Sequence, residues 1–340
     1  MSKKELGFGR VFTEHMVSAR WQEGEGWGPH TLTLRGDVSM DPACATLHYA
    51  QALFDGLKAF RCDDGALRIF RLDAHIERMV TGAPRLAMPP VDRAALAEAV
   101  IALVRRDGAH APEDGEGSLY IRPIVFAEEA YLGVRPSKVY RLLVLLSPVG
   151  SYGASGQRPL RLWVERHMVR AAPGGLGAVK APANYAASLL AGLQAQERGC
   201  DQVLWLDAVR RREVEEVGTM NLFAQIDGTV VTPPLAGTIL PGITRASVLS
   251  LLREAEVPVE ERPLALEELW EAGQRGTLEG VFGTGTAATI APVGELVTED
   301  DVLHVPVGRD RAAWLLARLR AIQRSTSTPH PWMTLVPPAA

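Results

Sequence analysis

Lysine is scarce in this 340-residue sequence, and arginine takes its place wherever a positive charge alone is needed. Lysine occurs only at positions 3, 4, 58, 138 and 180, so 31 of the 36 basic residues are arginine. A primary amine forms an imine with a carbonyl group, whereas a guanidinium does not. The scarcity therefore directs attention to Lys180, the last lysine of the chain.

Cysteine is also rare, and its spacing excludes two kinds of site. The three cysteines stand at positions 44, 62 and 200. They are odd in number and far apart, which excludes a disulfide framework and a CxxC metal or redox site. We therefore expect a protein of a reducing compartment, with the cytoplasm as the default.

Long apolar runs and a strong excess of one charge are absent too. No run reaches the ~18 apolar residues of a membrane span, and the first residues lack the apolar core of a signal peptide. The net charge is −4 and the sequence pI is about 6.1, so no basic surface is expected to attract nucleic acid or an anionic membrane. A hydrophobic content of 47% and a mean hydropathy of +0.02 indicate a soluble globular protein.

The length favours two domains, because one core rarely organises so long a chain. A Gly/Ser/Pro-rich stretch without periodicity covers residues 147–157. We predict a smaller N-terminal domain over 1–147, an interdomain loop over 148–159, and a larger C-terminal domain over 160–340 that carries Lys180. Strands and helices mix without strict βαβ alternation, which favours an α+β fold.

Hydrophobic periodicity and turn residues predict the elements of each half. In the first half, strands are expected at 7–12, 31–35, 58–61, 67–71, 118–126 and 139–147, and helices at 45–57, from Asp73 onward and at 91–106. In the second half, strands are expected at 160–166, 202–207, 220–226 and 229–232, and helices at 185–198, 244–256, 265–272 and 310–324. Asn184 is expected to cap the first of these helices, and Asp227-Gly228 to turn a hairpin.

The segment around Lys180 is an unusual place for a solvated charge. Its neighbours between Arg170 and Tyr185 are mostly small and apolar, with several glycines and prolines. We therefore interpret Lys180 as a Schiff-base lysine. The alternative is an ordinary lysine in a Gly/Pro-rich loop, with codon bias as the cause of the scarcity.

An enzyme that uses pyridoxal phosphate needs two further parts. A carboxylate keeps the ring nitrogen protonated, and backbone N–H groups at a helix start, helped by hydroxyls and an arginine, bind the phosphate. Ile243 and Thr244 follow a Pro-Gly turn at the predicted helix start, although an ordinary capped helix would have the same pattern. Acidic residues at 213–216 precede an apolar strand, where the alternative is a solvated strand end.

A second loop rich in small and hydroxyl residues covers 283–287, Gly-Thr-Gly-Thr-Ala. It also matches GxGxxA, the dinucleotide-binding pattern, which requires a βαβ unit with an acid about 20 residues further on. We reject that interpretation, because Pro292-Val293-Gly294 interrupts any long helix.

Two arginines of the first half are candidates for binding anions. Arg122 lies inside the apolar strand Tyr120-Ile121-Arg122-Pro123, where an unpaired guanidinium is costly. We expect it to meet a substrate carboxylate or a buried acid. Arg78 lies on the helix that begins near Asp73, where a surface charge is the commoner role.

Many ordered motifs of the chain resemble those of one known family, the branched-chain amino acid aminotransferases, which are fold-type IV pyridoxal-phosphate enzymes. The similarity extends from Phe8 almost to the C-terminus. The motifs are Phe8–Met16, Leu47–Tyr49, Leu53–Phe60, Leu119–Pro123, Leu145–Gly150, Asn184-Tyr185, Gln202–Leu206, Glu216–Asn221, Leu240–Gly242 and Phe282–Ala287. The resemblance implies a two-domain α+β architecture like that of D-amino acid aminotransferase.

The resemblance also implies a cofactor site for pyridoxal 5'-phosphate. Lys180 would hold the cofactor as an internal aldimine and move a proton between the substrate Cα and C4′ of the cofactor. Tyr185 would hydrogen-bond the phenolic oxygen, and Glu216 the ring nitrogen. The phosphate would be bound by Arg78, Ile243, Thr244 and Thr286, with Arg170 and Thr219 also at the cofactor.

The implied reaction moves the amino group of L-leucine, L-isoleucine or L-valine to 2-oxoglutarate, reversibly, with L-glutamate as product. The substrate α-carboxylate would lie at Thr286-Ala287, and Arg122 would take the distal carboxylate of glutamate. The aliphatic side chain would enter a pocket of Phe8, Phe54, Tyr120 and Thr219. Tyr49, Leu132 and Val134 would come from a second subunit, so a homodimer is implied.

Other interpretations remain open at this point. D-amino acid aminotransferase and aminodeoxychorismate lyase share the fold and the cofactor. A cofactor-free Schiff-base lyase would use Lys180 alone, and a binding protein would have lost catalysis. Some relatives carry a CxxC thiol pair after the Gly-Thr-Gly-Thr-Ala segment, but here those positions read Ala288–Ala291.

Overall fold

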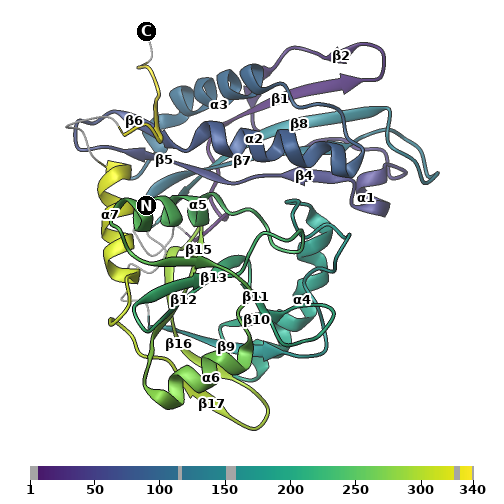
Figure 1. Cartoon of the computed structure of the whole chain (residues 1–340). Helices are drawn as coiled ribbons and strands as arrows, with labels where there is room; N and C mark the ends of the chain where they lie inside the picture. Colours follow the sequence, from purple (N-terminus) through teal and green to yellow (C-terminus); the bar gives the residue numbers. More distant parts are fainter. Residues whose placement is uncertain (1–6, 114–116, 151–157, 325–329, 339–340) are drawn as a thin grey trace. The chain divides into compact units, whose positions relative to one another are not determined.

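The computed structural model describes residues 7–113, 117–150, 158–324 and 330–338 (Figure 1). The chain forms two compact units. The first comprises Met1–Ala154, Val179–Pro182 and Arg320–Ala340, and the second comprises Ser155–Ala178 and Ala183–Leu319. The expected division at 148–159 therefore needs two changes, because the short segment with Lys180 and the C-terminal residues pack with the first unit.

Among the described residues of the first unit, nine strands form one antiparallel sheet in the order β18-β6-β5-β7-β8-β1-β2, with β3 paired to β1 and β4 to β7. The bounds are β1 His15–Gln22, β2 Gly26–Trp27, β3 Thr31–Leu34, β4 Ala52–Phe54, β5 Leu57–Arg61, β6 Leu67–Phe70, β7 Ser118–Ala127, β8 Val139–Val149 and β18 Met333–Leu335. The strand β18 pairs with β6, which explains why the C-terminal residues belong to this unit.

The helices of the first unit are α1 (Ala45–Tyr49), α2 (Leu72–Gly82), η1 (Ala83–Leu86), α3 (Arg93–Asp107) and η2 (Gly108–His110). Helix α3 begins where the Asp92 carboxylate accepts the Ala95 N–H at 3.0 Å, which satisfies one free donor of the first turn. Its buried face carries Leu96, Val100 and Leu103, one helical turn apart, and packs on β1 and β8.

The second unit is built on a sheet that closes on itself. Among its described residues the strand order is β11-β10-β9-β16-β15-β12-β13-β14, with β17 on β16, and β11 also pairs with β12. The bounds are β9 Leu160–Glu165, β10 Gln202–Leu206, β11 Val214–Val217, β12 Met220–Ile226, β13 Thr229–Thr232, β14 Val259–Glu261, β15 Leu278–Gly285, β16 Thr289–Val297 and β17 Val302–His304. The helices are α4 Pro182–Glu197, α5 Ile243–Glu254, α6 Leu266–Arg275 and α7 Ala312–Arg324.

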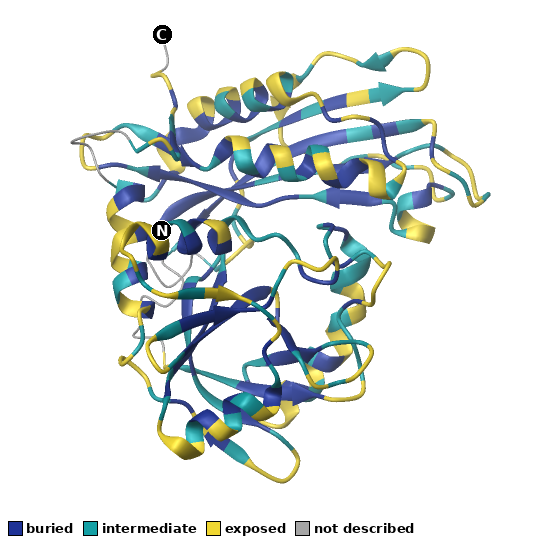
Figure 2. Ribbon diagram, in the orientation of Figure 1, coloured by how far each residue is buried: buried dark blue, intermediate teal, exposed yellow. Residues whose placement is uncertain are grey.

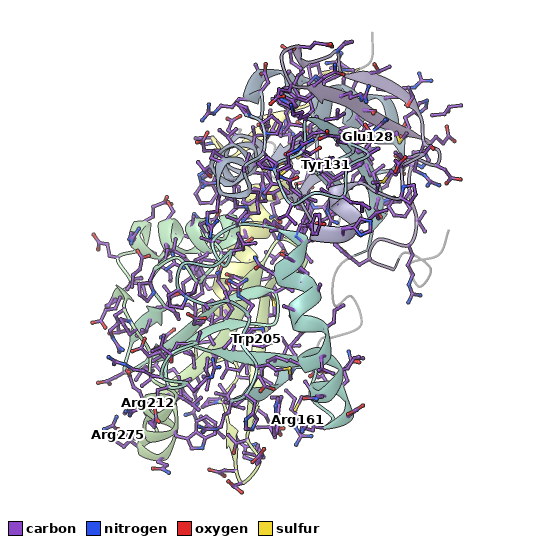
Figure 3. The ribbon with its side chains drawn as sticks, turned by 90° about the vertical axis from the view of Figure 1, so that its right-hand side faces the viewer. Glu128, Tyr131, Arg161, Trp205, Arg212 and Arg275 are labelled. Atoms are coloured by element: carbon purple, nitrogen blue, oxygen red, sulfur yellow. The ribbon has the colours of Figure 1, made fainter. Side chains whose placement is uncertain are left out.

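Alternation along the strands gives the closed sheet two apolar faces. One buried cluster includes Leu162, Leu204 and Leu222, with Leu269 of α6. The opposite face carries the next residues along the strands, such as Trp163 and Trp205, which pack under Ala191 and Ala195 of α4. Figure 2 shows the buried strands of each unit, and Figure 3 shows Trp205 beside α4.

The α+β class is confirmed, and most predicted elements form within a few residues of their expected bounds. The hairpin at Asp227-Gly228 is confirmed, with positive φ at both residues (50° and 76°) between β12 and β13. The loop 283–287 is not followed by a helix, because β15 turns directly into antiparallel β16. This geometry agrees with the rejection of a dinucleotide site.

Several element predictions were wrong. Residues 7–12 form a turn and irregular chain, and the helix predicted over 45–57 ends at Tyr49, where Ala50 adopts a left-handed conformation. Helix α4 begins at Pro182, so Asn184 lies inside the first turn and does not cap it. Proline suits the first position of a helix, because a backbone N–H at that position would have no hydrogen-bond acceptor within the helix. Part of the predicted interdomain loop, 151–157, lies outside the described residues.

No helix within the described ranges is long and apolar enough to cross a membrane. Those same residues contain no group of three or more His, Cys, Asp or Glu side chains arranged to hold a metal ion.

Candidate active site

Lys180 lies in a short segment of the first unit that packs against β4. Its carbonyl oxygen accepts the backbone N–H of Phe54 at 3.2 Å, and its Nζ lies 5.1 Å from the centre of the Phe54 ring. The neighbours Val179 and Ala181 are buried, while Lys180 itself is half-buried. The flanking residues thus anchor the backbone, and the amine stays at the edge of the unit's packed interior.

A buried charge network lies at the junction between β4 and β5. The Asp55 carboxylate is fully buried and accepts three hydrogen bonds from side chains: from Arg78 Nε (2.9 Å), a second Arg78 nitrogen (2.8 Å) and His75 Nδ1 (2.8 Å). Despite the burial of Asp55, Arg78 and His75 hold the pKa of its carboxyl well below the usual range. Burial lowers the pKa of His75, and we take the ring as neutral because Arg78 already balances the charge of Asp55. The network holds the predicted phosphate ligand Arg78 in one orientation.

Three of the four residues predicted for the aliphatic pocket, Phe8, Phe54 and Tyr120, belong to the first unit, whereas Thr219 belongs to the second. Phe8 and Tyr120 pack edge to face with ring centres 4.7 Å apart, and Tyr120 is largely buried. The Arg122 guanidinium lies over the rings of Phe54 (4.8 Å) and Tyr120 (5.2 Å) and donates one hydrogen bond to the Tyr120 hydroxyl at 2.8 Å. Arg122 Nε is buried and has no hydrogen-bond partner among the described residues. Arg122 therefore keeps a donor available beside an apolar surface.

The second unit has a cavity that several predicted cofactor residues share. It is lined by Arg170, Asn184, Tyr185, Ser188, Glu216, Gly218, Thr219 and Leu240. Glu216 was read from the sequence as preceding a strand, but it lies within β11 and is buried. Its carboxylate pairs with Arg170 Nε at 2.8 Å and accepts the Leu240 N–H at 3.0 Å and Asn221 Nδ2 at 3.1 Å. A guanidinium and two N–H donors stabilise the charged carboxylate in this buried position.

The predicted anion site lies at the start of α5. Gly242 occupies the N-cap position with no side-chain cap, and the helix begins with Ile243 and the buried Thr244. Thr286 and Ala287 are half-buried in the turn between β15 and β16. Thr284, at the end of β15, has a buried hydroxyl without a hydrogen-bond partner among the described residues. The start of α5 thus offers backbone N–H groups, and an unsatisfied hydroxyl lies on the strand that leads to Thr286.

Three of the residues predicted to bind substrate lie at the surface of the first unit. Tyr49, Leu132 and Val134 are exposed, and the Tyr49 hydroxyl donates to the Leu132 carbonyl at 2.5 Å. With Leu47 and Tyr131 they form an exposed apolar patch on the first unit, which we call the α1 patch.

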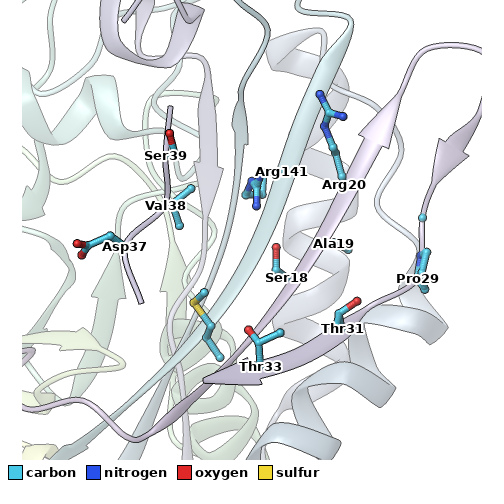
Figure 4. A pocket seen from close by; sticks show the side chains of 12 residues that line it. Ser18, Ala19, Arg20, Pro29, Thr31, Thr33, Asp37, Val38, Ser39 and Arg141 are labelled. Atoms are coloured by element: carbon cyan, nitrogen blue, oxygen red, sulfur yellow. The ribbon is translucent and has the colours of Figure 1, made fainter. Parts of the chain in front are cut away.

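A wider hollow of about 610 Å³ opens on β1, β3 and β8 of the first unit (Figure 4). It contains none of the predicted site residues. Its two arginines, Arg20 and Arg141, form ion pairs with Glu128, so the charges there are largely balanced within the chain. We assign no function to this hollow.

The sequence did not single out Asp55, His75, Asn221 and Thr284, which the structure places in these networks. For Asp55 a signal existed, because an acid stands inside the apolar stretch Leu53–Leu57. For Thr284 the only local signal was its place in the hydroxyl-rich segment 283–287. Asn221 stands opposite Glu216 across the short hairpin of β11 and β12, and the long-range pairing of β12 with β15 places Thr284 opposite Asn221.

Comparison with known proteins shows the family. The family described as amino-transferase class IV matches residues 52–296. Branched-chain-amino-acid transaminase 1 of Bacillus subtilis is 47% identical over 292 residues, which cover 86% of this chain and 82% of the relative. The branched-chain-amino-acid aminotransferase of Mycobacterium tuberculosis H37Rv is 44% identical over 338 residues, covering 97% and 92% of the two chains. The crystal structure of the Escherichia coli branched-chain amino acid aminotransferase superposes with a TM-score of 0.77 at 26% identity, covering 94% of this chain and 100% of that one.

The matched family spans most of the chain, and the relatives are similar over nearly their whole length. The chain belongs to the class IV amino-transferases, and it is a transaminase. The resemblance seen in the motifs is confirmed at the level of the family, and its relatives are named as branched-chain enzymes.

Proposed function

We propose that this protein is a pyridoxal 5'-phosphate-dependent branched-chain amino acid aminotransferase. It moves the amino group of L-leucine, L-isoleucine or L-valine to 2-oxoglutarate, and the reaction is reversible. The identity to relatives that carry this name supports the substrate class. The observation that carries the proposal is the buried Glu216 carboxylate, fixed by Arg170, Leu240 and Asn221 in the wall of a cavity that Tyr185 also lines.

The residues present fit this cofactor. Burial of a carboxylate is costly unless a cation or donors compensate it, and Glu216 has both. A protonated ring nitrogen is the partner that such a fixed negative charge stabilises best. In the second unit, the N–H groups at the start of α5 and the unsatisfied Thr284 hydroxyl suit a phosphate. In the first unit, the fixed guanidinium of Arg78 has the chemistry of an anion ligand.

The cofactor supplies an electron sink for the carbanion that forms when the substrate Cα loses its proton. Each residue of the chain has a separate task. Lys180 would hold the cofactor through its amine and would move the proton between the substrate Cα and the cofactor. Tyr185 would donate a hydrogen bond to the phenolic oxygen, and Glu216 would hold the proton of the ring nitrogen. Ile243, Thr244, Thr286 and Arg78 are assigned to the phosphate, with Arg170, which pairs with Glu216, also at the cofactor.

The first unit supplies recognition of the side chain. Phe8, Phe54 and Tyr120 form an apolar surface that rewards each buried methylene by about 0.8 kcal/mol, which favours leucine, isoleucine and valine over alanine. From the second unit, Thr219 is assigned to the same side chain and the Thr286-Ala287 turn to the α-carboxylate. The buried Nε of Arg122 is the donor for the distal carboxylate of glutamate or 2-oxoglutarate.

A homodimer completes the proposal. The α1 patch, which includes Tyr49, Leu132 and Val134, and the leucines Leu189, Leu190 and Leu193 of α4 are large apolar side chains exposed on a single chain. Such surfaces usually mark an interface. The three cysteines are buried free thiols, which suits the reducing cytoplasm proposed as the location.

Borohydride reduction followed by peptide mapping tests the core of the proposal. The expected product is a pyridoxyl adduct on Lys180, with loss of activity. An adduct on another lysine, or none in a colourless protein, contradicts it. A parallel assay with L-leucine or D-alanine as donor to 2-oxoglutarate separates the proposed reaction from that of a D-amino acid aminotransferase.

A further inference from the structure

Asn221 connects two parts of the second unit that the proposed function uses separately. Its Nδ2 donates to Glu216 Oε1 at 3.1 Å and to the Leu240 carbonyl at 2.9 Å. The Leu240 N–H donates to the same Glu216 oxygen at 3.0 Å. The carboxylate, the carboxamide and the Leu240 peptide thus form a closed set of hydrogen bonds. Both partners of Nδ2 are acceptors, which fixes the orientation of the amide.

The other side of the Asn221 side chain lies close to Gly242, the N-cap residue just before α5. A Cβ added to Gly242 would lie 1.9 Å from Asn221 Oδ1, so the glycine leaves room for the carboxamide. Gly242 has φ −70° and ψ 132°, a conformation open to any residue, so its backbone alone does not require glycine. Asn221 is therefore held between Glu216 of β11 and Gly242, the N-cap of α5.

We propose that Asn221 is a positioning residue, which ties the Glu216 carboxylate to the Leu240–Gly242 turn so that the ring-nitrogen acid and the phosphate-binding start of α5 are set as one unit. The proposal rests on the proposed cofactor site and adds a role to a residue without contact to the reacting atoms. Loss of the Asn221 hydrogen bonds should therefore weaken the binding of the cofactor ring and of its phosphate together.

Binding of pyridoxal phosphate and of pyridoxal, which lacks the phosphate, to the apoprotein tests this coupling. Asn221→Leu removes the hydrogen bonds at nearly constant volume. We expect roughly tenfold weaker binding of pyridoxal phosphate. The preference for pyridoxal phosphate over pyridoxal should fall several-fold. The matched control is Gln225→Leu. Gln225 lies on the same strand, and its buried amide donates to Glu279 and not to Glu216. This variant should leave the preference for pyridoxal phosphate over pyridoxal unchanged.

Gly242→Ala gives an independent measurement. The added methyl group would displace the carboxamide, so this variant alone should bind pyridoxal phosphate about as weakly as Asn221→Leu. In the Asn221→Ala background the clash is gone, and Gly242→Ala should then cause little further loss. Losses that multiply in the double variant, or an unchanged preference in Asn221→Leu, overturn the proposal.

Different outcomes test the proposed function and the positioning role of Asn221. If the wild-type protein takes no pyridoxal phosphate on Lys180, the proposed function is wrong. If it does, while the Asn221 and Gly242 variants behave like the Gln225 control, only the positioning role is wrong.

Discussion

Two neighbouring glutamates of β11 have different partners, and we propose different roles for them. Glu215 and Glu216 are both buried, but successive side chains point to opposite faces. Glu216 meets Arg170 and the cavity, whereas Glu215 accepts from the Thr238 hydroxyl, and burial raises its pKa. The pair therefore provides a variant and its control one residue apart.

Glu216→Gln should retain the cofactor but lower turnover roughly a hundredfold or more, because the ring nitrogen is no longer held protonated. Steady-state kinetics with L-leucine measures the effect. The loss of the charge opposite Arg170 also lowers the free energy of unfolding, so the variant is assayed well below its Tm. Glu215→Gln should keep near-normal turnover, and equal losses in both variants would show that Glu216 has no special role.

Arg122→Met should discriminate between the two kinds of substrate. A hydrogen bond to a charged group contributes about 1.5–3 kcal/mol, so kcat/KM for 2-oxoglutarate should fall about tenfold to a hundredfold. Half-reactions with L-leucine should change much less, since methionine preserves the apolar contact. Tyr120→Phe, which removes only the hydroxyl bonded to Arg122, should have a smaller effect. Parallel losses for both substrates would refute the assignment of the distal carboxylate.

At the scale of elements, the junction between β4 and β5 joins several parts of the first unit. Phe54 bonds to the Lys180 backbone, Asp55 holds Arg78 and His75, and Gly56 lies under the Tyr120 hydroxyl. Three successive residues thus contact the lysine segment, the arginine proposed to bind the phosphate, and Tyr120 of the proposed substrate pocket. The strand register between β4, β5 and β7 places all three.

Gly56→Ala should damage this junction, because its Cβ would lie 1.8 Å from the Tyr120 hydroxyl oxygen. We expect a loss of about 1–3 kcal/mol in the free energy of unfolding and a higher KM for leucine. Denaturant unfolding and kinetics measure both. Gly36→Ala, at a position with open space, is the control, and Tyr120→Leu in the Gly56→Ala background should restore stability. An unaffected Gly56→Ala variant would show that Tyr120 moves freely.

At the scale of the whole molecule, the buried pair Asp55 and His75 predicts how stability depends on pH. Burial lowers the folded-state pKa of His75 below its unfolded value near 6.5, so below that pH the unfolded chain binds more protons. The folded pKa of Asp55 is also depressed, so its contribution is present above about 3.8 and lost below it. Both groups make acid destabilising.

The free energy of unfolding should therefore fall as the pH drops below 6.5, by up to about 1.4 kcal/mol per pH unit from His75. Urea unfolding at a series of pH values measures the slope. His75→Gln should flatten the curve between pH 6.5 and 5, whereas His110→Gln, at an exposed site, should leave it unchanged. The same slope in the His75 variant would show that this ring does not titrate as we infer.

Assembly gives a second prediction at this scale. The apolar side chains of the α1 patch and of α4 are expected to be covered in a homodimer. Leu190→Glu, in the exposed leucine group of α4, should shift the mass in sedimentation equilibrium toward the monomer, because a buried unpaired charge is costly. Val209→Glu, at a 73% exposed position in a loop, is the control. A wild-type protein that is monomeric at micromolar concentration contradicts the prediction.

The sequence by itself determined the α+β class, most strands and helices, and the residue types of a lysine enzyme. Hydrophobic period, turn residues and the isolated Lys180 are local signals, readable without the fold. The sequence predicts a single helix over 45–57, because a short apolar stretch does not distinguish a helix from a strand. Only the pairing of β4 with β7 shows where the helix α1 ends and a strand follows.

Tertiary structure alone decided which polar groups meet. Asp55 and His75 are 20 residues apart, and Glu216, Asn221 and Thr284 lie on three different strands. The encounters of Asp55 with His75 and of Thr284 with Asn221 depend on pairings distant in sequence, which no local pattern encodes, whereas Glu216 and Asn221 face each other across the short hairpin of β11 and β12. For the same reason the segment at 179–182 belongs with the first unit, since its hydrogen bond to Phe54 exists only after the chain has folded back.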